Sequence, residues 1–373
     1  DHSLDYLQQG ADFIIIGEVE VTLQQLINTL QTESTYFESI NGIAYLQENK
    51  LIKTISRPVL TDLDNLPFPA WKFIQMKDYQ RAWLRKSGYF SLNMTTTRGC
   101  PFKCNWCAKP IYGNRYNSRS PEKVVEEIDF LISNYQVEHI WFCDDIFGLK
   151  PGWIKRFSEL VVSKNLQFKF KIQCRADLLL DDENIQHLAN AGCDEIWIGA
   201  ESGSQKILDA MDKGTTVKQI YTATRLMQKH GIKPCLFLQF GYLDELQTDI
   251  DLTIKMVFDL MPYDIGVSVS YPLPGTQFYE KVKSQLQIKQ NWSDSDELLL
   301  MYKSTYSPAY YKQLHRYIHK KFRLAQGKKY FRSLLNGKMK PNKTFTRRIL
   351  TMPVFLVATI WHKRKMDLLS KQQ

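Results

Sequence analysis

Between residue 91 and about residue 285, short apolar segments alternate with segments of helical periodicity, and this alternation limits the possible folds more than any other feature. Strands that are joined by crossover helices run parallel, with right-handed connections. The predicted strands are 91–97, 139–143, 167–173, 195–199, 234–240 and 265–271. We therefore predict an α/β fold, a partial (β/α)6 barrel of the TIM type. Such barrels carry their chemistry at the carboxyl ends of the strands.

Three cysteines follow the first predicted strand. Cys100, Cys104 and Cys107 have the spacing C-x3-C-x2-C. Cysteine thiolates hold iron–sulfur clusters, and a 4Fe–4S cluster normally takes four of them. A set of three leaves one iron open, and an open coordination position is what separates catalytic from structural zinc sites. We therefore predict that these three residues ligate a 4Fe–4S cluster and make its open iron available for chemistry.

A zinc site is the main alternative for the same residues. Zinc sites usually combine two C-x2-C pairs, or one such pair with histidines. Cys104 and Cys107 form one pair, and no second pair follows. The other cysteines stand alone and are expected in the core: Cys143, Cys174, Cys193 and Cys235. Because they do not form a disulfide framework, we expect a reducing, cytoplasmic compartment.

The cysteine spacing, together with Arg98-Gly99 before it and Trp106 within it, resembles the radical S-adenosylmethionine (SAM) superfamily. Residues 10–18 and 63–71 resemble the subgroup in which a cobalamin-binding domain precedes the barrel. This subgroup includes anaerobic magnesium-protoporphyrin monomethyl ester cyclases and hopanoid methylases. The resemblance implies that the open iron binds SAM and that reductive cleavage yields a 5′-deoxyadenosyl radical. It further implies methylation, cyclisation or rearrangement at an unactivated carbon, with a reductant such as flavodoxin or ferredoxin.

The same resemblance implies SAM contacts at the ends of later strands. A guanidinium and several carboxylates there suit the carboxylate and ammonium groups of SAM. Besides Trp106, the expected cofactor-binding residues are Asp144, Asp145, Arg175, Glu201, Ser202, Pro274 and Gly275. Structural roles remain open as well: the two aspartates at a helix start, Arg175 in an ion pair with Asp177 or Glu201, and a plain turn at 274–275.

Three regions are expected along the chain. Residues 1–75 resemble the end of a cobalamin-binding domain with its linker, 76–290 form the barrel, and 291–373 form a basic helical region. The cobalamin-ligating signature Asp-x-His-x-x-Gly does not occur in the sequence. Because the chain starts at Asp1 and enters a patterned segment at once, we expect an N-terminally truncated protein. Cobalamin is then expected only if the missing domain supplies it.

Positive charge is concentrated at the C-terminal end. Residues 310–373 contain 17 Lys and Arg against one acid, Asp367, although the net charge of the chain is only +10. The rest of the chain is therefore net acidic, which argues against nucleic-acid binding by the main body. The apolar run 349–361 is shorter than the ~20 residues of a spanning helix. Its basic flanks predict peripheral membrane contact through 347–365, or else a helix packed on the barrel.

Membrane contact would favour a lipid-like substrate over another small molecule. Two other functions remain open. The basic region also suits a methylthiotransferase-like radical SAM enzyme that modifies RNA, although no second cysteine set or RNA-binding β-domain is recognisable. The other is a non-catalytic iron–sulfur or zinc protein that binds nucleic acid or a membrane through its basic region.

Overall fold

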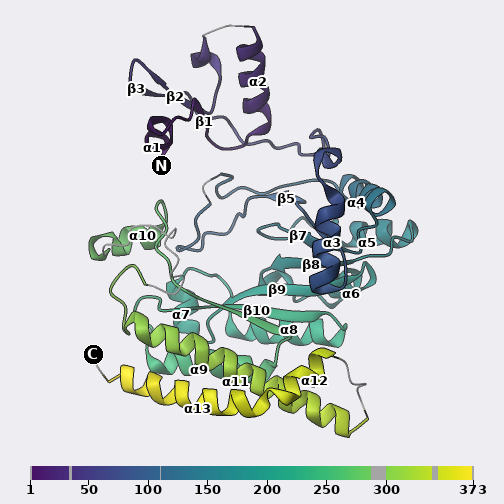
Figure 1. Ribbon diagram of the computed structural model, residues 1–373, viewed down its shortest axis with the longest axis vertical. Coiled ribbons are helices and arrows are strands. Elements are labelled where there is room, and N and C mark those ends of the chain that lie inside the picture. Colours follow the sequence, from purple (N-terminus) through teal and green to yellow (C-terminus); the bar gives the residue numbers. More distant parts are fainter. Residues whose placement is uncertain (1, 33–35, 110, 287–299, 338–342, 372–373) are drawn as a thin grey trace.

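The computed structural model describes residues 2–32, 36–109, 111–286, 300–337 and 343–371, except the side chains of 343–345 (Figure 1). The expected boundary at 290–291, between barrel and C-terminal region, lies outside the described residues. From the top to the bottom of Figure 1 lie the N-terminal segment, the strands of the main sheet, and the long C-terminal helices.

Six parallel strands form the central sheet, in the order β11-β10-β9-β8-β7-β4. Sequential strands are neighbours, and β4 and β11 lie at opposite ends, so the barrel is open. The strands are β4 (Ser91–Met94), β7 (His139–Phe142), β8 (Lys169–Cys174), β9 (Cys193–Glu201), β10 (Lys233–Phe240) and β11 (Asp264–Val269). The predicted α/β fold with six parallel strands is confirmed.

Each strand of this sheet is followed by one or two helices. The helices are α4 (Pro121–Tyr135), α5 (Trp153–Ser163), α6 (Asp182–Asn190), α7 (Gln205–Ala210), α8 (Val217–Lys229), α9 (Gln247–Leu260) and α10 (Gln277–Val282). Helix α4 begins at Pro121, and the Ser120 hydroxyl accepts a hydrogen bond from the Lys123 amide at 3.2 Å.

The two faces of the sheet differ in burial. Ile140 and Phe170 are fully buried and belong to the main hydrophobic core, together with α4 and α5 side chains such as Val124 and Phe157. Trp141, the next residue after Ile140, is only half-buried. Because successive strand residues point to opposite faces, the helices cover the outer face, and the inner face of the open barrel remains accessible.

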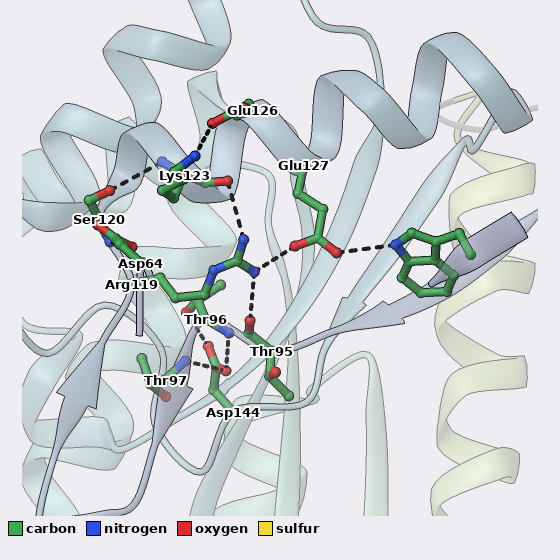
Figure 2. Close-up of polar contacts among 11 residues, drawn as sticks. Asp64, Thr95, Thr96, Thr97, Arg119, Ser120, Lys123, Glu126, Glu127 and Asp144 are labelled. Atoms are coloured by element: carbon green, nitrogen blue, oxygen red, sulfur yellow. Dashed lines mark hydrogen bonds and ion pairs between the residues drawn. The ribbon is translucent and has the colours of Figure 1, made fainter. Parts of the chain in front are cut away.

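A long loop between β4 and α4 carries the three cysteines. At its base β5 (Thr97–Arg98) pairs with β6 (Asn117–Ser118) in antiparallel orientation. Asp144, which follows β7, is 2% exposed and accepts hydrogen bonds from the Thr96 and Thr97 amides at 2.7 and 3.0 Å (Figure 2). The Thr96 hydroxyl donates to the same carboxylate at 2.5 Å. This carboxylate therefore fixes the point at which the loop leaves the sheet.

Residues 2–53 form a small separate unit. It contains α1 (Ser3–Gln8), α2 (Glu20–Gln31) and a sheet of β1 (Phe13–Ile15), β2 (Ile43–Gln47) and β3 (Lys50–Lys53). The strands β2 and β3 form an antiparallel hairpin. The segment 10–18, which resembles part of a cobalamin-binding domain, contains β1, and β1 pairs antiparallel with β2. Leu26, Ile40, Ile43 and Tyr45 form a core of their own.

A linker and α3 (Met76–Ser87) connect this unit to the barrel. The Trp71 indole N–H donates to Glu127 of α4 at 3.3 Å, and Glu127 also pairs with Arg119 at 2.6 Å (Figure 2). The Asp64 carboxylate accepts a hydrogen bond from the Ser120 amide at 2.9 Å. The linker therefore lies against the amino-terminal half of α4.

The C-terminal region consists of α11 (Pro308–Leu335), α12 (Lys343–Leu350) and α13 (Met352–Leu369). Tyr310, Leu314 and Ile318 of α11 belong to the same hydrophobic core as the barrel. Helix α13 packs on α11, away from the strands (Figure 1), and His362 lies 2.8 Å from the Gln313 side-chain oxygen. None of the helices in the described ranges is long and apolar enough to cross a membrane.

Candidate active site

The three cysteines of the loop line one cavity of ≈ 320 Å³. Cys174 and Arg175 at the end of β8, and Glu201 at the end of β9, line the same cavity. The cavity therefore lies at the carboxyl ends of parallel strands, where the fold predicts the chemistry. All three cysteines are partly buried and form no disulfide.

Burial in the cavity wall raises the proton affinity of the Cys100 and Cys107 thiols. Burial raises the pKa of the Cys107 thiol to about 11 and that of Cys100 above its ordinary value, although the nearby Lys109 ammonium opposes both shifts. The thiolates of the set also repel one another. A bound metal deprotonates coordinating thiols outright. These thiols are therefore suited to ligating a positively charged iron centre rather than to acting as free nucleophiles.

Within the described part of the chain, no three His, Cys, Asp or Glu side chains are placed to hold a single metal ion. A 4Fe–4S cluster makes a different demand, because each cysteine binds a different iron. Three neighbouring thiols around a cavity meet that demand without converging on one point. The donor set therefore fits an iron–sulfur cluster.

Asn105 anchors the cysteine loop from within. Its amide N–H donates to the Met211 carbonyl at 3.0 Å, and its side-chain NH2 donates to the Ala210 carbonyl and the Asp212 carboxylate, each at 2.8 Å. Its side-chain oxygen accepts a hydrogen bond from the Tyr242 hydroxyl at 2.8 Å. These contacts fasten the loop between Cys104 and Trp106 to the segments that follow α7 and β10.

Arg175 contacts four groups around the cavity. Its guanidinium pairs with Asp177 at 3.0 Å, donates to the Lys213 carbonyl at 2.7 Å, and lies 3.6 Å from the Cys104 sulfur. The same group lies 3.7 Å from the ring centre of Phe102. The ion pair with Asp177 was one of the roles that the sequence left open, and Arg175 forms it while still lining the cavity.

Glu201 and Lys213 form a buried ion pair across the cavity wall. The ammonium and the carboxylate are 2.8 Å apart, and both side chains are at most 7% exposed. Glu201 has φ of +55°, a left-handed conformation that is unfavourable for a residue with a Cβ atom. Gly199 leaves the space for this pair, because a Cβ atom there would lie 2.6 Å from the Lys213 nitrogen.

The two neighbouring aspartates have different roles. Asp145 lines the cavity, and burial raises its pKa while Lys109 opposes the shift. Asp144 does not line it; its carboxylate binds the Thr96–Thr97 turn, and burial raises its pKa to about 6 against these hydrogen bonds. Neither is at a helix start, since α5 begins at Trp153.

Of the remaining predicted cofactor-binding residues, Trp106 lines the cavity, whereas Ser202, Pro274 and Gly275 do not. Trp106 lines the cavity, and its indole N–H is buried without a hydrogen-bond partner among the described residues. Ser202 is fully buried, with its hydroxyl 3.0 Å from that of Thr253. Pro274 and Gly275 lie in the turn before α10 and are not part of the lining.

The scattered cysteines occupy different environments. Cys174, Cys193 and Cys235 are buried as predicted, and Cys174 also lines the cavity. The prediction was wrong for Cys143, which is exposed. It lies just past the end of β7, in a second hollow of ≈ 770 Å³ beside the linker. The alternation of β7 explains its exposure, because Ile140 and Phe142 point into the core and Cys143 points to the other face.

Sequence reasoning missed several residues of the site. Lys213 lies in a turn after α7, Lys109 lies beyond the last cysteine, and Asn105 lies within the cysteine loop. Lone lysines and asparagines in turns are too common to attract attention. For Asn105, its position between two predicted cluster ligands was the available signal.

Comparison with known proteins agrees with this architecture. Residues 94–257 match the model of the radical SAM superfamily. An uncharacterized methyltransferase of Pyrococcus horikoshii is 27% identical over 283 residues, which is 75% of this chain and 60% of the relative. The anaerobic magnesium-protoporphyrin IX monomethyl ester cyclase of Cereibacter sphaeroides is also 27% identical over 283 residues, 74% of this chain and 45% of the relative.

A solved structure shares the fold. The cobalamin-dependent SAM radical enzyme OxsB, with aqua-cobalamin bound, superposes with a TM-score of 0.72 over 97% of this chain and 58% of that chain, at 19% identity. An open α/β barrel with three cysteines that fit an iron–sulfur cluster is typical of a class of metalloenzymes. The chain carries a domain of the radical SAM superfamily, which implies a 4Fe–4S cluster and SAM as cofactors. It spans about half the length of the two curated relatives, 60% and 45%.

Proposed function

We propose that this chain holds the catalytic core of a radical SAM enzyme that modifies an unactivated carbon by methylation, cyclisation or rearrangement. One observation carries the proposal: Cys100, Cys104 and Cys107 surround one cavity together with Arg175 and the Glu201–Lys213 pair. When bound, the cluster and SAM supply a 5′-deoxyadenosyl radical after one-electron reduction, with flavodoxin or ferredoxin as the proposed reductant. The protein positions and shields this chemistry.

The roles of the residues follow from their contacts. Arg175 holds Phe102 and the Cys104 sulfur in place and presents its guanidinium to the SAM carboxylate. Lys213 and Glu201 offer opposite charges to the two ends of the amino-acid group. Asp145 faces the cavity and supplies the acidic contact proposed for the aspartate pair.

The predicted residues outside the lining support the site indirectly. Asp144 fixes the base of the cysteine loop. Ser202 accepts a hydrogen bond from the Ser204 amide at 3.1 Å and so shapes the turn after β9. Pro274 and Gly275 shape the turn before α10, whose Phe278 amide donates to the Asn105 carbonyl at 2.9 Å.

We propose cobalamin as a cofactor only if a further N-terminal domain supplies its binding site. The structural neighbour OxsB is described as cobalamin-dependent, and this chain covers 58% of it. The signature Asp-x-His-x-x-Gly does not occur in this sequence. We propose that residues 1–75 form the junction to such a domain, that 76–290 form the barrel, and that 291–373 form a basic helical region. All seven cysteines are free, which suits a reducing, cytoplasmic compartment.

The test is anaerobic reconstitution with iron and sulfide, reduction, and chromatography for 5′-deoxyadenosine after addition of SAM. The wild type should release the nucleoside, and a C100A/C104A/C107A variant should not. Cys193→Ala is the matched control, because this cysteine is buried on β9 outside the cavity. A well-formed cluster without SAM cleavage would contradict the proposal, and bound zinc in place of iron would favour the non-catalytic alternative.

We also propose that α13 contacts an anionic membrane surface, which makes a lipid-like substrate accessible. The inward side of α13 meets α11 through His362 and Met366. The outward side is apolar at Val354, Val357 and Trp361, which are 66%, 69% and 53% exposed. Exposed apolar side chains in such a row mark an interaction surface.

Charge identifies the partner of this surface. Arg347 lies just before the exposed apolar row, and Arg364 and Lys365 continue it, all three exposed. An apolar helix face with basic residues at both ends suits the headgroup region of an anionic leaflet. An RNA would also satisfy the charge, but it would leave the aliphatic side chains unused.

Cosedimentation with vesicles tests this contact. The protein should bind phosphatidylserine-containing vesicles and bind neutral phosphatidylcholine vesicles much more weakly. Val357→Glu should abolish sedimentation, whereas Val162→Glu, at a valine 58% exposed on α5, should leave it intact. Equal loss of vesicle binding in both variants would refute the membrane proposal and indicate a general charge effect. RNA capture without vesicle binding would refute it in favour of the RNA-modifying alternative.

A further inference from the structure

The inner face of the barrel carries aromatic side chains next to the cluster cavity. Trp197 on β9 and Phe237 on β10 line the cavity and stack with ring centres 4.6 Å apart and an interplanar angle of 29°. Phe237 is 36% exposed although it lies on a central strand of a parallel sheet. Central strands of such sheets are normally covered on both faces. An exposed aromatic pair there therefore indicates a surface that a ligand covers.

The backbone of the next strand makes room for this pair. Gly266 of β11 is opposite Phe237 in the sheet. A Cβ atom at Gly266 would lie 3.0 Å from the Phe237 ring and 3.3 Å from the Trp197 ring. A larger residue would push the two rings out of their stacked position. The glycine keeps a flat aromatic surface directed toward the interior.

A cation lies deeper on the same face. Lys171 is two residues before Gln173, a lining residue of the cavity, and hence about 6.6 Å further down β8. Its ammonium lies 3.8 Å from the ring centre of Trp141. The ammonium forms no ion pair within the described ranges, although the carboxylate of Glu195, its register partner on β9, interacts with it electrostatically at longer range. Lys171 is therefore held in place by an aromatic ring and remains available to an anion.

The aromatic pair and Lys171 are not needed to bind the cluster or the amino-acid group of SAM. Cys100, Cys104, Cys107, Arg175 and the Glu201–Lys213 pair account for the cluster and the amino-acid group of SAM in the function proposed above. The aromatic pair lines the same cavity, and the deeper lysine lies beyond its lining on the inner face of the barrel. A second ligand that meets them must offer a flat apolar body and a negative charge some distance from it.

We propose that the inner face binds the substrate of the radical reaction, a molecule with a flat, conjugated ring system and an anionic carboxylate or phosphate substituent. The ring system lies on Phe237 and Trp197, and the anion binds Lys171 over Trp141. This inference rests on the proposed function for the reaction. Its binding chemistry can be tested without turnover.

The test uses two probes of nearly equal shape. 8-Anilinonaphthalene-1-sulfonate carries a flat naphthalene ring and a negative charge, and N-phenyl-1-naphthylamine is its neutral counterpart; both fluoresce when bound in an apolar site. Because both also adhere to exposed apolar helices, dissociation constants are measured in a Val357→Glu background, which removes the outward face of α13. The wild-type inner face should bind the anionic probe more tightly than the neutral one.

The variants separate the two contacts. Phe237→Ala should weaken both probes by roughly threefold to tenfold, as expected for the loss of one aromatic contact. Lys171→Gln should weaken only the anionic probe, whereas Lys169→Gln, two residues earlier on the same strand, should change neither. Equal effects of the two lysine variants, or no effect of Phe237→Ala, would overturn the inference.

The outcomes also separate this inference from the proposed function. If the protein releases 5′-deoxyadenosine but the probes ignore Phe237 and Lys171, only the substrate class is wrong. If the probes respond as expected but no nucleoside forms, the inner face binds flat anions in a protein that is not a radical SAM enzyme.

Discussion

Arg175 shows how one side chain holds several parts of the site together. Its guanidinium reaches Asp177, the Lys213 carbonyl, the Cys104 sulfur and the Phe102 ring. Only a planar group with several fixed N–H donors can make these contacts at once. The side chain therefore couples the cysteine loop to β8 and to the turn after α7.

Replacement of this residue should loosen the cluster. Arg175→Lys keeps the charge but loses the planar donors, so we expect lower iron content and weaker charge-transfer absorbance after reconstitution. Arg156→Lys is the control, because Arg156 pairs with Glu122 at an exposed position. Iron content equal to wild type in Arg175→Lys would show that the contact with Cys104 does not support the cluster.

Glu245, which does not line the cavity, is a buried carboxylic acid with a strongly raised pKa. It is fully buried, and one oxygen accepts a hydrogen bond from the Gly241 amide at 2.7 Å. The other has no partner among the described residues. Burial raises its pKa from 4.5 to about 8. The folded protein therefore binds this proton more tightly than the unfolded chain does.

Stability should fall as pH rises. The raised pKa stabilises the fold fully below about pH 4.5, and this contribution is lost as pH rises through about 8. The slope for one group is at most about 1.4 kcal/mol per pH unit. Urea unfolding of Glu245→Gln should lack this dependence, whereas Asp244→Asn, at the exposed neighbour, should retain it. Parallel pH profiles for wild type and Glu245→Gln would contradict the assignment.

At the scale of elements, the cysteine loop depends on one tight backbone contact. Gly99 has φ of +84°, and a Cβ atom there would lie 2.4 Å from the Arg115 carbonyl oxygen. Gly88, which ends α3, has φ of +80°, and its Cβ position has no atom within 4 Å. The two glycines share a conformation and differ in the space around them.

Alanine variants of Gly88 and Gly99 distinguish the cost of the left-handed backbone conformation from the cost of a steric clash. Gly88→Ala should cost about 1–2 kcal/mol of unfolding free energy through the left-handed conformation alone. Gly99→Ala should cost more, because the segments before Cys100 and around Arg115 must also move apart, and it should reduce iron incorporation. Urea unfolding and iron analysis of both variants provide the check; equal costs would mean that the contact at Gly99 relaxes freely.

At the scale of the whole molecule, the N-terminal unit contacts the cysteine loop directly. Arg98, two residues before Cys100, pairs with Glu18 at 2.6 Å and with Glu20. Glu18 is 7% exposed, so this ion pair is shielded from water. These ion pairs therefore link the N-terminal unit to the loop that carries Cys100 and the other two proposed cluster ligands.

Loss of these ion pairs should release the unit. We expect that the double variant Glu18→Gln/Glu20→Gln is cleaved faster by limited proteolysis in the linker between 57 and 75, while the barrel fragment remains intact. Glu48→Gln, in the exposed hairpin turn, is the control. Unchanged cleavage kinetics in the double variant would show that the linker contacts around Glu127 hold the unit by themselves.

The sequence by itself determined the order of strands and helices, the parallel sheet and the place of the cysteine loop after the first strand. These features depend on local periodicity and on residue spacing, and both can be read along the chain. Cys100, Cys104 and Cys107 were recognisable because the three residues lie close together in the sequence.

Only the tertiary structure decided which side chains face the cavity. Asp145 and Asp144 are neighbours in sequence, yet one lines the cavity and the other holds the Thr96–Thr97 turn. Lys213 joins the site through Glu201, and the packing of α13 on α11 leaves Val354 and Val357 exposed. Each result depends on contacts between distant residues. Such contacts are fixed by how the elements pack together and leave no local pattern in the sequence.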